Sequence, residues 1–457
     1  MKVSFIDDEP EIYPLQYGGK ARTILALARS ALDFDVIDEV TVLSRSINDP
    51  RDEFTDYDGV KFEKLDDQNM VGRLTEEAEE VDVLSVHTCS FTFPRIPLER
   101  RRAALVYHLH DVMLTTADKG SHLDKALAGD WDAVISPSSF ATRTFRNFAA
   151  LTGSPAEVHT INRGVDFELF YNVPKAKALK KLAEWGVQLD EKDGPILFFP
   201  GRADVGKGDD RIGQICESLS EDYSNLTVIT TFDVDSRQQH PRVKHIGWQE
   251  SANLKYLYSV ADITLSLSRL PESFSQVCIE SVACGTPVLA FPFGNLPGLA
   301  EALPAVVTCE PSTDAIIRGI RRLLTDPKMG DVLRESRTIL ETDYNMKTIS
   351  EVYMRLYLDI AQNHKDKLVV PETFFISPFA TLQNGKVYLS GNNELPPKIY
   401  DLSENELAVM ACCGNAVSIE EIRLTTGLSH ETIRSTLGSL AKRKVIIGGR
   451  NGGVGSF

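Results

Sequence analysis

The 457-residue sequence lacks several features that would define its class at once. Its seven cysteines form no Cys-x-x-Cys pair and no Cys/His cluster, which argues against a disulfide framework or a structural zinc site. The longest apolar stretch, residues 277–293, is interrupted by Glu280, Gly285 and two prolines, so it predicts no membrane-spanning helix. The first residues show no basic segment followed by an apolar one. We therefore expect a cytoplasmic protein without a signal peptide.

Net positive charge is also missing. The formal net charge is -16 at pH 7, so the overall field of the chain does not attract a polyanion such as nucleic acid. One short basic cluster, residues 100–102, is too small to predict membrane binding, and attachment to a membrane surface stays an open alternative. We expect neither nucleic acid nor a membrane as the main partner.

Short apolar runs alternate with helical patterns through most of the chain, which predicts two α/β domains with parallel sheets. The first domain is expected at residues 1–188, completed by a helix at 345–362, and the second at 189–344. The expected strands of the first domain are 3–6, 39–43, 81–86, 104–107, 131–136 and 158–161. Those of the second domain are 195–200, 226–229, 243–246, 263–267 and 287–291.

The last section, residues 371–457, follows a different pattern. Residues 379–389 predict a hairpin with an Asn-Gly turn. Ser403 with Glu406, and Ser418 with Glu421, have the spacing of capping boxes that open two helices. A third helix at 430–443 and a strand at 445–447 complete a winged-helix arrangement.

A helix is predicted between residues 273 and 285, with Ser273 or Ser275 capping its start. The amino terminus of a helix presents free backbone N–H groups and a partial positive charge, which suit a phosphate. Glu272 and Glu280 flank this seat. Carboxylates repel phosphate, so these two suit hydroxyl groups on either side of it, one set on a sugar and one on a ribose.

Further candidate groups follow the ends of other predicted strands, where open α/β sheets bind ligands. Arg202 and Lys207 lie in a glycine-rich loop after the strand at 195–200, and two cations there would neutralise a diphosphate. Taken alone, this basic loop is a weak signal. The remaining candidates lie in the first domain and are Gly18, Gly19, His110 and Asp111.

Together these motifs resemble the retaining glycosyltransferases of family 4, which have the GT-B fold of two Rossmann-like domains facing a central crevice. The resemblance covers about residues 1–360 and includes the glutamates seven residues apart and the basic pair. Residues 162–166, Asn-Arg-Gly-Val-Asp, look like the family's Asn-Gly-Val-Asp loop with one inserted residue. Ser275 departs from the family because glycine is common there, and residues 294–298 depart from its usual Gly-Gly-Leu-Pro-Glu.

The resemblance implies a role for each of these residues. Arg202 and Lys207, with amides near Ser273, Phe274 and Ser275, would bind the donor diphosphate and stabilise the leaving group. Glu280 would hold the ribose and Glu272 the donor sugar. His110 and Asp111 would lie near the transferred sugar, and Gly18 and Gly19 near the phosphates or the acceptor. The implied activity is retaining sugar transfer from a nucleotide sugar, with no cofactor.

Four Asp-x-Asp triplets, at residues 33–35, 56–58, 130–132 and 233–235, could hold a metal against a diphosphate. An acidic chain produces such triplets by chance, and none shares its context with the basic pair. We therefore predict that no metal is required.

The acceptor and the role of residues 371–457 stay open. From Lys398 onward seven basic residues face six acidic ones, which is no electrostatic footprint for nucleic acid. The hairpin and three helices also look like the peptide-recognition domains of ribosomal-peptide modification pathways. We expect this section to recruit an acceptor peptide or a partner protein, or to mediate dimerisation. The alternative is a regulator whose transferase-like body senses nucleotide sugars while the winged helix binds DNA.

Overall fold

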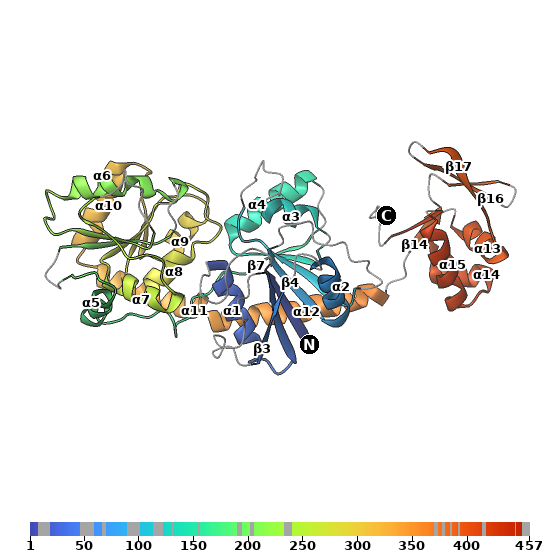
Figure 1. Cartoon of the computed structure of the whole chain (residues 1–457), viewed down its shortest axis with the longest axis horizontal. Helices are drawn as coiled ribbons and strands as arrows, with labels where there is room; N and C mark the ends of the chain where they lie inside the picture. Colours follow the sequence, from blue (N-terminus) through green and yellow to red (C-terminus); the bar gives the residue numbers. More distant parts are fainter. Residues whose placement is uncertain are drawn as a thin grey trace. The chain divides into compact units, whose positions relative to one another are not determined.

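The computed structural model describes most of the chain in two compact units, Met1–His364 and Lys365–Phe457. The residues described are 1–7, 19–45, 59–65, 70–88, 101–112, 122–129, 131–152, 156–189, 194–201, 205–232, 240–369, 373–376, 380–383, 386–391, 394–413, 417–443 and 445–449. Figure 1 shows the helices and strands of each unit.

The first unit begins with a sheet of seven parallel strands in the order β3-β2-β1-β4-β5-β6-β7. These strands are β1 Lys2–Asp7, β2 Glu39–Ser44, β3 Val60–Lys64, β4 Val83–Thr88, β5 Ala104–His108, β6 Ala133–Ser136 and β7 Val158–Thr160. The helices of this part are α1 Gly19–Ala31, α2 Met70–Glu80, α3 His122–Ala128 and α4 Ser139–Thr152. All six strands expected from the sequence are present, whereas the sequence did not predict β3.

Side chains on these strands alternate between two cores, as a strand with a helix layer on each face requires. Val83 of β4 belongs to the core that α1 and α12, Met346–Val369, cover. Its neighbour Leu84 belongs to the opposite core, under α2, α3 and α4. The helix expected at 345–362 is therefore present, extends further than expected, and packs on the first sheet.

A second sheet has six parallel strands in the order β10-β9-β8-β11-β12-β13. They are β8 Ile196–Phe199, β9 Thr227–Thr230, β10 Val243–His245, β11 Ile263–Ser266, β12 Val288–Ala290 and β13 Val306–Thr308. The α-helices around it are α5 Lys175–Glu184, α6 Ile212–Leu219, α7 Ser251–Val260, α8 Gln276–Ala283, α9 Leu296–Ala302, α10 Thr313–Thr325 and α11 Met329–Asp343. The predicted pair of parallel-sheet domains is confirmed, while the boundary at 188/189 stays a prediction.

The second unit contains a small sheet in the order β15-β16-β17 and another in the order β18-β14-β19. Its strands are β14 Thr373–Ile376, β15 Ala380–Gln383, β16 Lys386–Gly391, β17 Glu394–Asp401, β18 Val417–Ser418 and β19 Ile446–Gly449. Its helices are α13 Glu404–Cys412, α14 Ile419–Thr426 and α15 His430–Lys442. Both predicted capping boxes are present. The predicted strands pair at Gln383 and Lys386, and their Asn-Gly turn lies outside the described residues.

The backbone at Gly164 packs closely against the first residue of α12, and a substitution there tests this contact. A Cβ at this glycine would lie 2.6 Å from the Met346 Cα, closer than backbone atoms can approach. We expect Gly164→Ala to destabilise the protein by about 1–3 kcal/mol, as overpacking does. Gly330→Ala is the matched control, because the nearest atom to its Cβ is the flexible end of Arg334 at 3.6 Å.

The control change should raise stability slightly, by about 0.4–1 kcal/mol, since alanine suits a helix better than glycine. Thermal unfolding of both variants measures the difference. Equal unfolding temperatures for the two variants would contradict the tight contact at Gly164.

Candidate functional site

The start of α8 has an unusual backbone conformation. Ser275 precedes the helix with φ of 76°, the only positive φ at a non-glycine residue among those described. Such a value favours glycine, which explains why glycine is common at this position in the family that the sequence resembles. The side chain of Ser275 makes no capping bond to the helix and lies 3.3 Å from the Cys278 sulfur. Ser275 thus occupies the predicted cap position, but without a capping hydrogen bond from its side chain.

Glu280 is fully buried on α8. One of its carboxylate oxygens accepts a hydrogen bond from the Arg22 guanidinium at 2.7 Å, and the other accepts from the Tyr258 hydroxyl at 3.0 Å. Burial raises the pKa of Glu280, while Arg22 and Tyr258 act in the opposite direction. Arg22 belongs to α1 on the first sheet, so this ion pair joins the two sheets. No local sequence pattern indicates this partner.

The predicted acid and base beside the phosphate seat are in contact. The Lys207 Nζ lies 2.5 Å from a carboxylate oxygen of Glu272, and both side chains are partly exposed. The backbone of Glu272 also pairs with Gly294, where a Cβ would lie 2.3 Å from the Glu272 carbonyl oxygen. Gly294 therefore allows the approach that positions Glu272. Arg202, the other predicted cation, lies outside the described residues.

Several contacts join the carboxyl ends of the two sheets, and we call this region the inter-sheet junction. Ser273 donates its hydroxyl to the backbone carbonyl of His110 at 2.6 Å, and Ser138 donates to the Ser273 carbonyl at 2.6 Å. Gln276 donates to the Gly164 carbonyl at 2.9 Å. The second-sheet loop before α8 is thus attached to loops that follow β5, β6 and β7.

The predicted residues of the first sheet lie at or next to this junction. Arg163 donates to Nδ1 of His110 at 2.6 Å. Gly19 begins α1, and a Cβ on it would lie 3.6 Å from the Gln276 Cβ, so it faces α8. Asp111 follows His110 and is half-buried. Gly18 lies outside the described residues.

Phe274 lies in the same loop, but its side chain is buried in the core of the second sheet. Only its backbone is available to a ligand. The structure therefore brings together Gly19, His110, Lys207, Glu272, Ser273, Ser275 and Glu280. It adds five residues that the sequence analysis did not select as site residues: Arg22, Ser138, Arg163, Tyr258 and Gln276.

Within the described ranges, no three His, Cys, Asp or Glu side chains gather as metal ligands do. Nor does any helix described combine the length and apolarity needed to cross a bilayer. The prediction that no metal is required stays a prediction.

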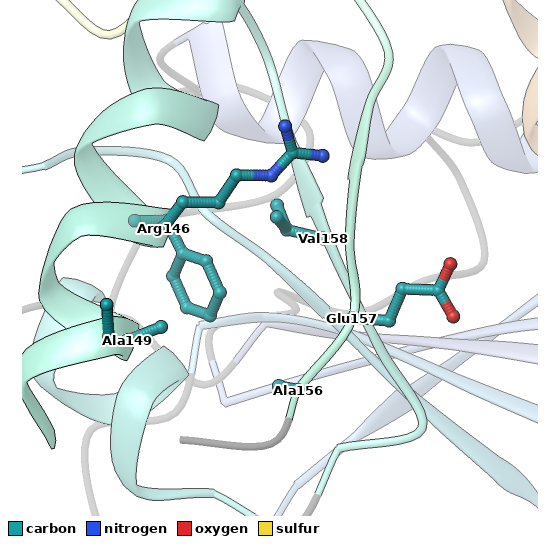
Figure 2. A pocket seen from close by; sticks show the side chains of 7 residues that line it. Arg146, Ala149, Ala156, Glu157 and Val158 are labelled. Carbon is teal, nitrogen blue, oxygen red and sulfur yellow. The ribbon is translucent and has the colours of Figure 1, made fainter. Parts of the chain in front are cut away.

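A separate pocket of about 520 Å³ lies between α4 and β7 (Figure 2), and none of the residues that line it belongs to the junction. Arg146 and Glu157 are among the residues that line it, with Phe145, Ala149, Ala150, Ala156 and Val158. None of them is a candidate site residue, so this pocket does not form part of the proposed site.

The second sheet and its helices match a known family. Residues 187–338 match the family model described as glycosyl transferases group 1, a range that includes Lys207, Glu272 and Glu280. The matched range is thus similar to glycosyltransferase group 1 domains, and it contains all six strands of the second sheet.

Individual proteins are also similar in sequence to this chain. The chain is 20% identical over 292 residues to the lipopolysaccharide 1,2-N-acetylglucosaminetransferase of Salmonella typhimurium, covering 60% of this chain and 71% of that protein. It is 31% identical over 155 residues to the D-inositol 3-phosphate glycosyltransferase of Mycobacteroides abscessus, covering 31% of this chain and 33% of that protein. The latter match thus spans about a third of that relative.

Among solved structures, Anabaena HepE in complex with UDP-glucose superposes with a TM-score of 0.61 and 19% sequence identity. The superposition covers 80% of this chain and all of HepE. At this identity the likeness concerns the fold, and it confirms the predicted GT-B architecture of the two large domains.

The Arg22–Glu280 ion pair generates a pH-dependent prediction. Without Arg22 the buried carboxylate loses a cation, so its pKa should rise further above the ordinary 4.5. A carboxyl group whose pKa is higher in the folded than in the unfolded protein lowers the free energy of unfolding once the pH rises above its unfolded pKa. We expect Arg22→Met to lower the free energy of unfolding by about 3 kcal/mol at pH 8, and by clearly less at pH 5.

Thermal unfolding at the two pH values tests this expectation. The double variant Arg22→Met, Glu280→Gln is the control, because it removes the charge that the single change leaves uncompensated. It should regain much of the stability at pH 8. A loss that is the same at both pH values, and that the double variant does not relieve, would contradict the assigned role of the ion pair.

Proposed function

We propose that the chain is a retaining glycosyltransferase that uses a nucleotide-sugar donor and requires neither a metal ion nor a cofactor. The match of residues 187–338 supports glycosyl transfer as the activity. The similarity to HepE, which was solved with UDP-glucose, supports a nucleotide sugar as the donor.

The observation that carries the proposal is the contact between Lys207 and Glu272 beside the start of α8. In this contact each charge neutralises the other. A bound donor would separate them, with its diphosphate taking Lys207 and its sugar hydroxyls taking Glu272. This one ion pair thus contains a cation for the diphosphate and a carboxylate for the sugar hydroxyls of the donor.

The remaining candidates have complementary roles. Arg202 would share the diphosphate with Lys207, assisted by backbone amides near Ser273, Phe274 and Ser275. Ribose hydroxyls would bind Glu280, sharing it with Arg22 or replacing Arg22 there. His110 and Asp111 would border the transferred sugar, with Gly18 and Gly19 close to the phosphates or the acceptor.

The reaction needs no protein nucleophile in this proposal. The bond between the anomeric carbon and the donor phosphate oxygen breaks as the acceptor oxygen bonds that carbon from the same face. The acceptor hydroxyl proton passes to the leaving diphosphate. Lys207 and Arg202 stabilise the negative charge that develops there, and such preorganised charge is usually the largest catalytic contribution.

A thermal-shift panel of nucleotide sugars tests donor binding. A donor at about 100 times its dissociation constant should add ~2.7 kcal/mol of stability. Lys207→Ala should abolish this shift, whereas Lys328→Ala, an exposed residue at the start of α11, should keep it. Donor hydrolysis should also fall at least tenfold in Lys207→Ala and in Glu272→Ala. A full shift and full turnover in Lys207→Ala would refute the proposed site.

For the second unit we propose recruitment of an acceptor peptide or a partner protein, or dimerisation. In the sheet β15-β16-β17, the end strand β17 pairs with β16 on one side only among the described residues. An extended peptide can add to such an edge as a further strand. The winged-helix comparison stays a proposal, since a three-stranded sheet precedes α13 here rather than a single hairpin.

Contacts inside the unit disfavour the alternative of a DNA-binding regulator. Arg443 forms an ion pair with Glu406, and its guanidinium lies 5.6 Å from the ring centre of Tyr400. Arg423 pairs with Glu420 on the same helix. Two of the seven basic residues are therefore neutralised within the unit, which weakens any attraction to phosphates.

A chain that ends at residue 370 tests this second proposal. It should still hydrolyse the donor, because Lys207, Glu272 and Glu280 all lie in the first unit. Its acceptor affinity or its oligomeric state should change, measured by transfer kinetics and by light scattering. If both are unchanged, the recruitment proposal is wrong. Salt-dependent binding of duplex DNA by the full chain would favour the regulator instead.

A further inference from the structure

A chain of polar side chains leads from the inter-sheet junction into the core under α12. Ser85, His87 and Tyr357 are fully buried, and His108 is 3% exposed. The core around them is otherwise apolar, since Ser85, His87 and His108 share a face of the first sheet with residues such as Val83, and Tyr357 of α12 packs on that face. Polar groups are costly in such a core unless each is hydrogen-bonded. Their presence there therefore asks for an explanation.

The hydrogen bonds form a continuous series. His110 Nε2 lies 3.0 Å from His87 Nδ1, and His87 Nε2 lies 3.1 Å from the Ser85 Oγ. The same oxygen lies 3.0 Å from His108 Nε2 and 2.7 Å from the Tyr357 hydroxyl. The rings of His87 and His108 are stacked, with centroids 3.8 Å apart. His110 thus stands at the junction end of a rigid network.

Arg163 gives this series a direction. A guanidinium only donates hydrogen bonds, so His110 Nδ1 must be the acceptor and carries no proton. The proton of the neutral ring is then on Nε2, which donates to His87 Nδ1. By the same logic His87 carries its proton on Nε2 and donates it to Ser85. One donor-only group at the junction therefore determines two successive tautomers.

Two titratable groups near His110, His108 and Arg163, have pKa values shifted by burial. Burial, with a smaller contribution from Arg163, lowers the pKa of His108 to about 3. The His108 ring, which stacks on His87, is therefore neutral. Burial lowers the pKa of Arg163 as well, with Arg22 acting in the same direction and Tyr353 and Glu272 opposing it. A guanidinium starts from so high a pKa that it keeps its charge in proteins.

Three further groups lie along this part of the network. Ser273 holds the His110 backbone carbonyl, Asp111 is its chain neighbour, and Tyr357 of α12 closes the network behind His108. Neither the Ser273 contact nor the Tyr357 contact supplies a proton to Nδ1. A second proton on His110 would have to displace the Arg163 hydrogen bond.

We propose that Arg163 and His87 are positioning residues that hold His110 as the neutral tautomer with its proton on Nε2. The inference rests on the proposed function, in which His110 borders the transferred sugar. An uncharged ring held in this way cannot take the acceptor proton at Nδ1 while Arg163 is bound. This agrees with the proposed function, in which the leaving diphosphate takes that proton. Arg163 is the inserted residue of the Asn-Arg-Gly-Val-Asp loop, so the insertion supplies the donor that sets the His110 tautomer.

Nitrogen-15 NMR of the histidine rings tests the tautomer without any turnover. The chain has nine histidines, and the His110 signals are assigned by their loss in His110→Asn. In the full-length protein we expect an unprotonated Nδ1 and a protonated Nε2 from pH 6 to pH 8. In Arg163→Met the tautomer ratio should shift by about tenfold or more, since a hydrogen bond from a charged donor is lost. Arg163→Lys, which keeps a charged donor, should preserve the wild-type ratio.

A protonated Nδ1 in the wild type would overturn the proposal, as would identical His110 shifts in wild type and Arg163→Met. The wild-type measurement decides the matter even if Arg163→Met fails to fold, which circular dichroism detects. Donor hydrolysis gives a second readout. In Arg163→Met kcat should fall about tenfold with little change in KM, and Arg163→Lys should recover most of it. A wild type with the expected tautomer but no turnover on any donor would refute the proposed function and leave the tautomer assignment standing.

Discussion

A carboxylate with no exposed surface, that of Glu280, is the constraint on which the arrangement of the first unit depends. A buried charge is tolerable only when a partner compensates it, and breaking such a pair is costly. The compensating cation, Arg22, comes from α1 on the other sheet, so the second sheet can bury Glu280 at low cost only when the first sheet is in place. The hydroxyl bonds of Ser138 and Ser273 at the same junction then fix the loops that carry His110 and Glu272.

The fold and half of the site follow from local patterns. Strands buried on both faces appear as short apolar runs, which is why residues 3–6 and 263–267 were predicted as strands of parallel sheets. The prediction that the basic loop and the acid before α8 serve one site rests on a general rule, that parallel strands direct their carboxyl ends to one edge. Lys207 and Glu272 obey it, although 65 residues separate them.

The features that were missed have no local signature. Arg22 and Glu280 are 258 residues apart, and no periodicity on α1 indicates a partner on α8. Tyr357 resembles any other apolar position of α12 until the fold brings it to Ser85. Strand β17 was missed for another reason, because it contains Pro396 and Pro397. Proline removes a backbone donor, and strands tolerate it mainly at the edge of a sheet, where β17 lies.

One helix connects the two ends of the polar network. The first residue of α12, Met346, donates its backbone N–H to the Val165 carbonyl at 3.0 Å, directly after the loop that carries Arg163. Three turns later the same helix supplies Tyr357. Because a helix is rigid over this length, α12 fixes the positions of the Arg163 guanidinium and the Tyr357 hydroxyl, at the two ends of the network, relative to each other. The tautomer of His110 is therefore a property of how α12 packs on the first sheet, and not of the junction residues alone.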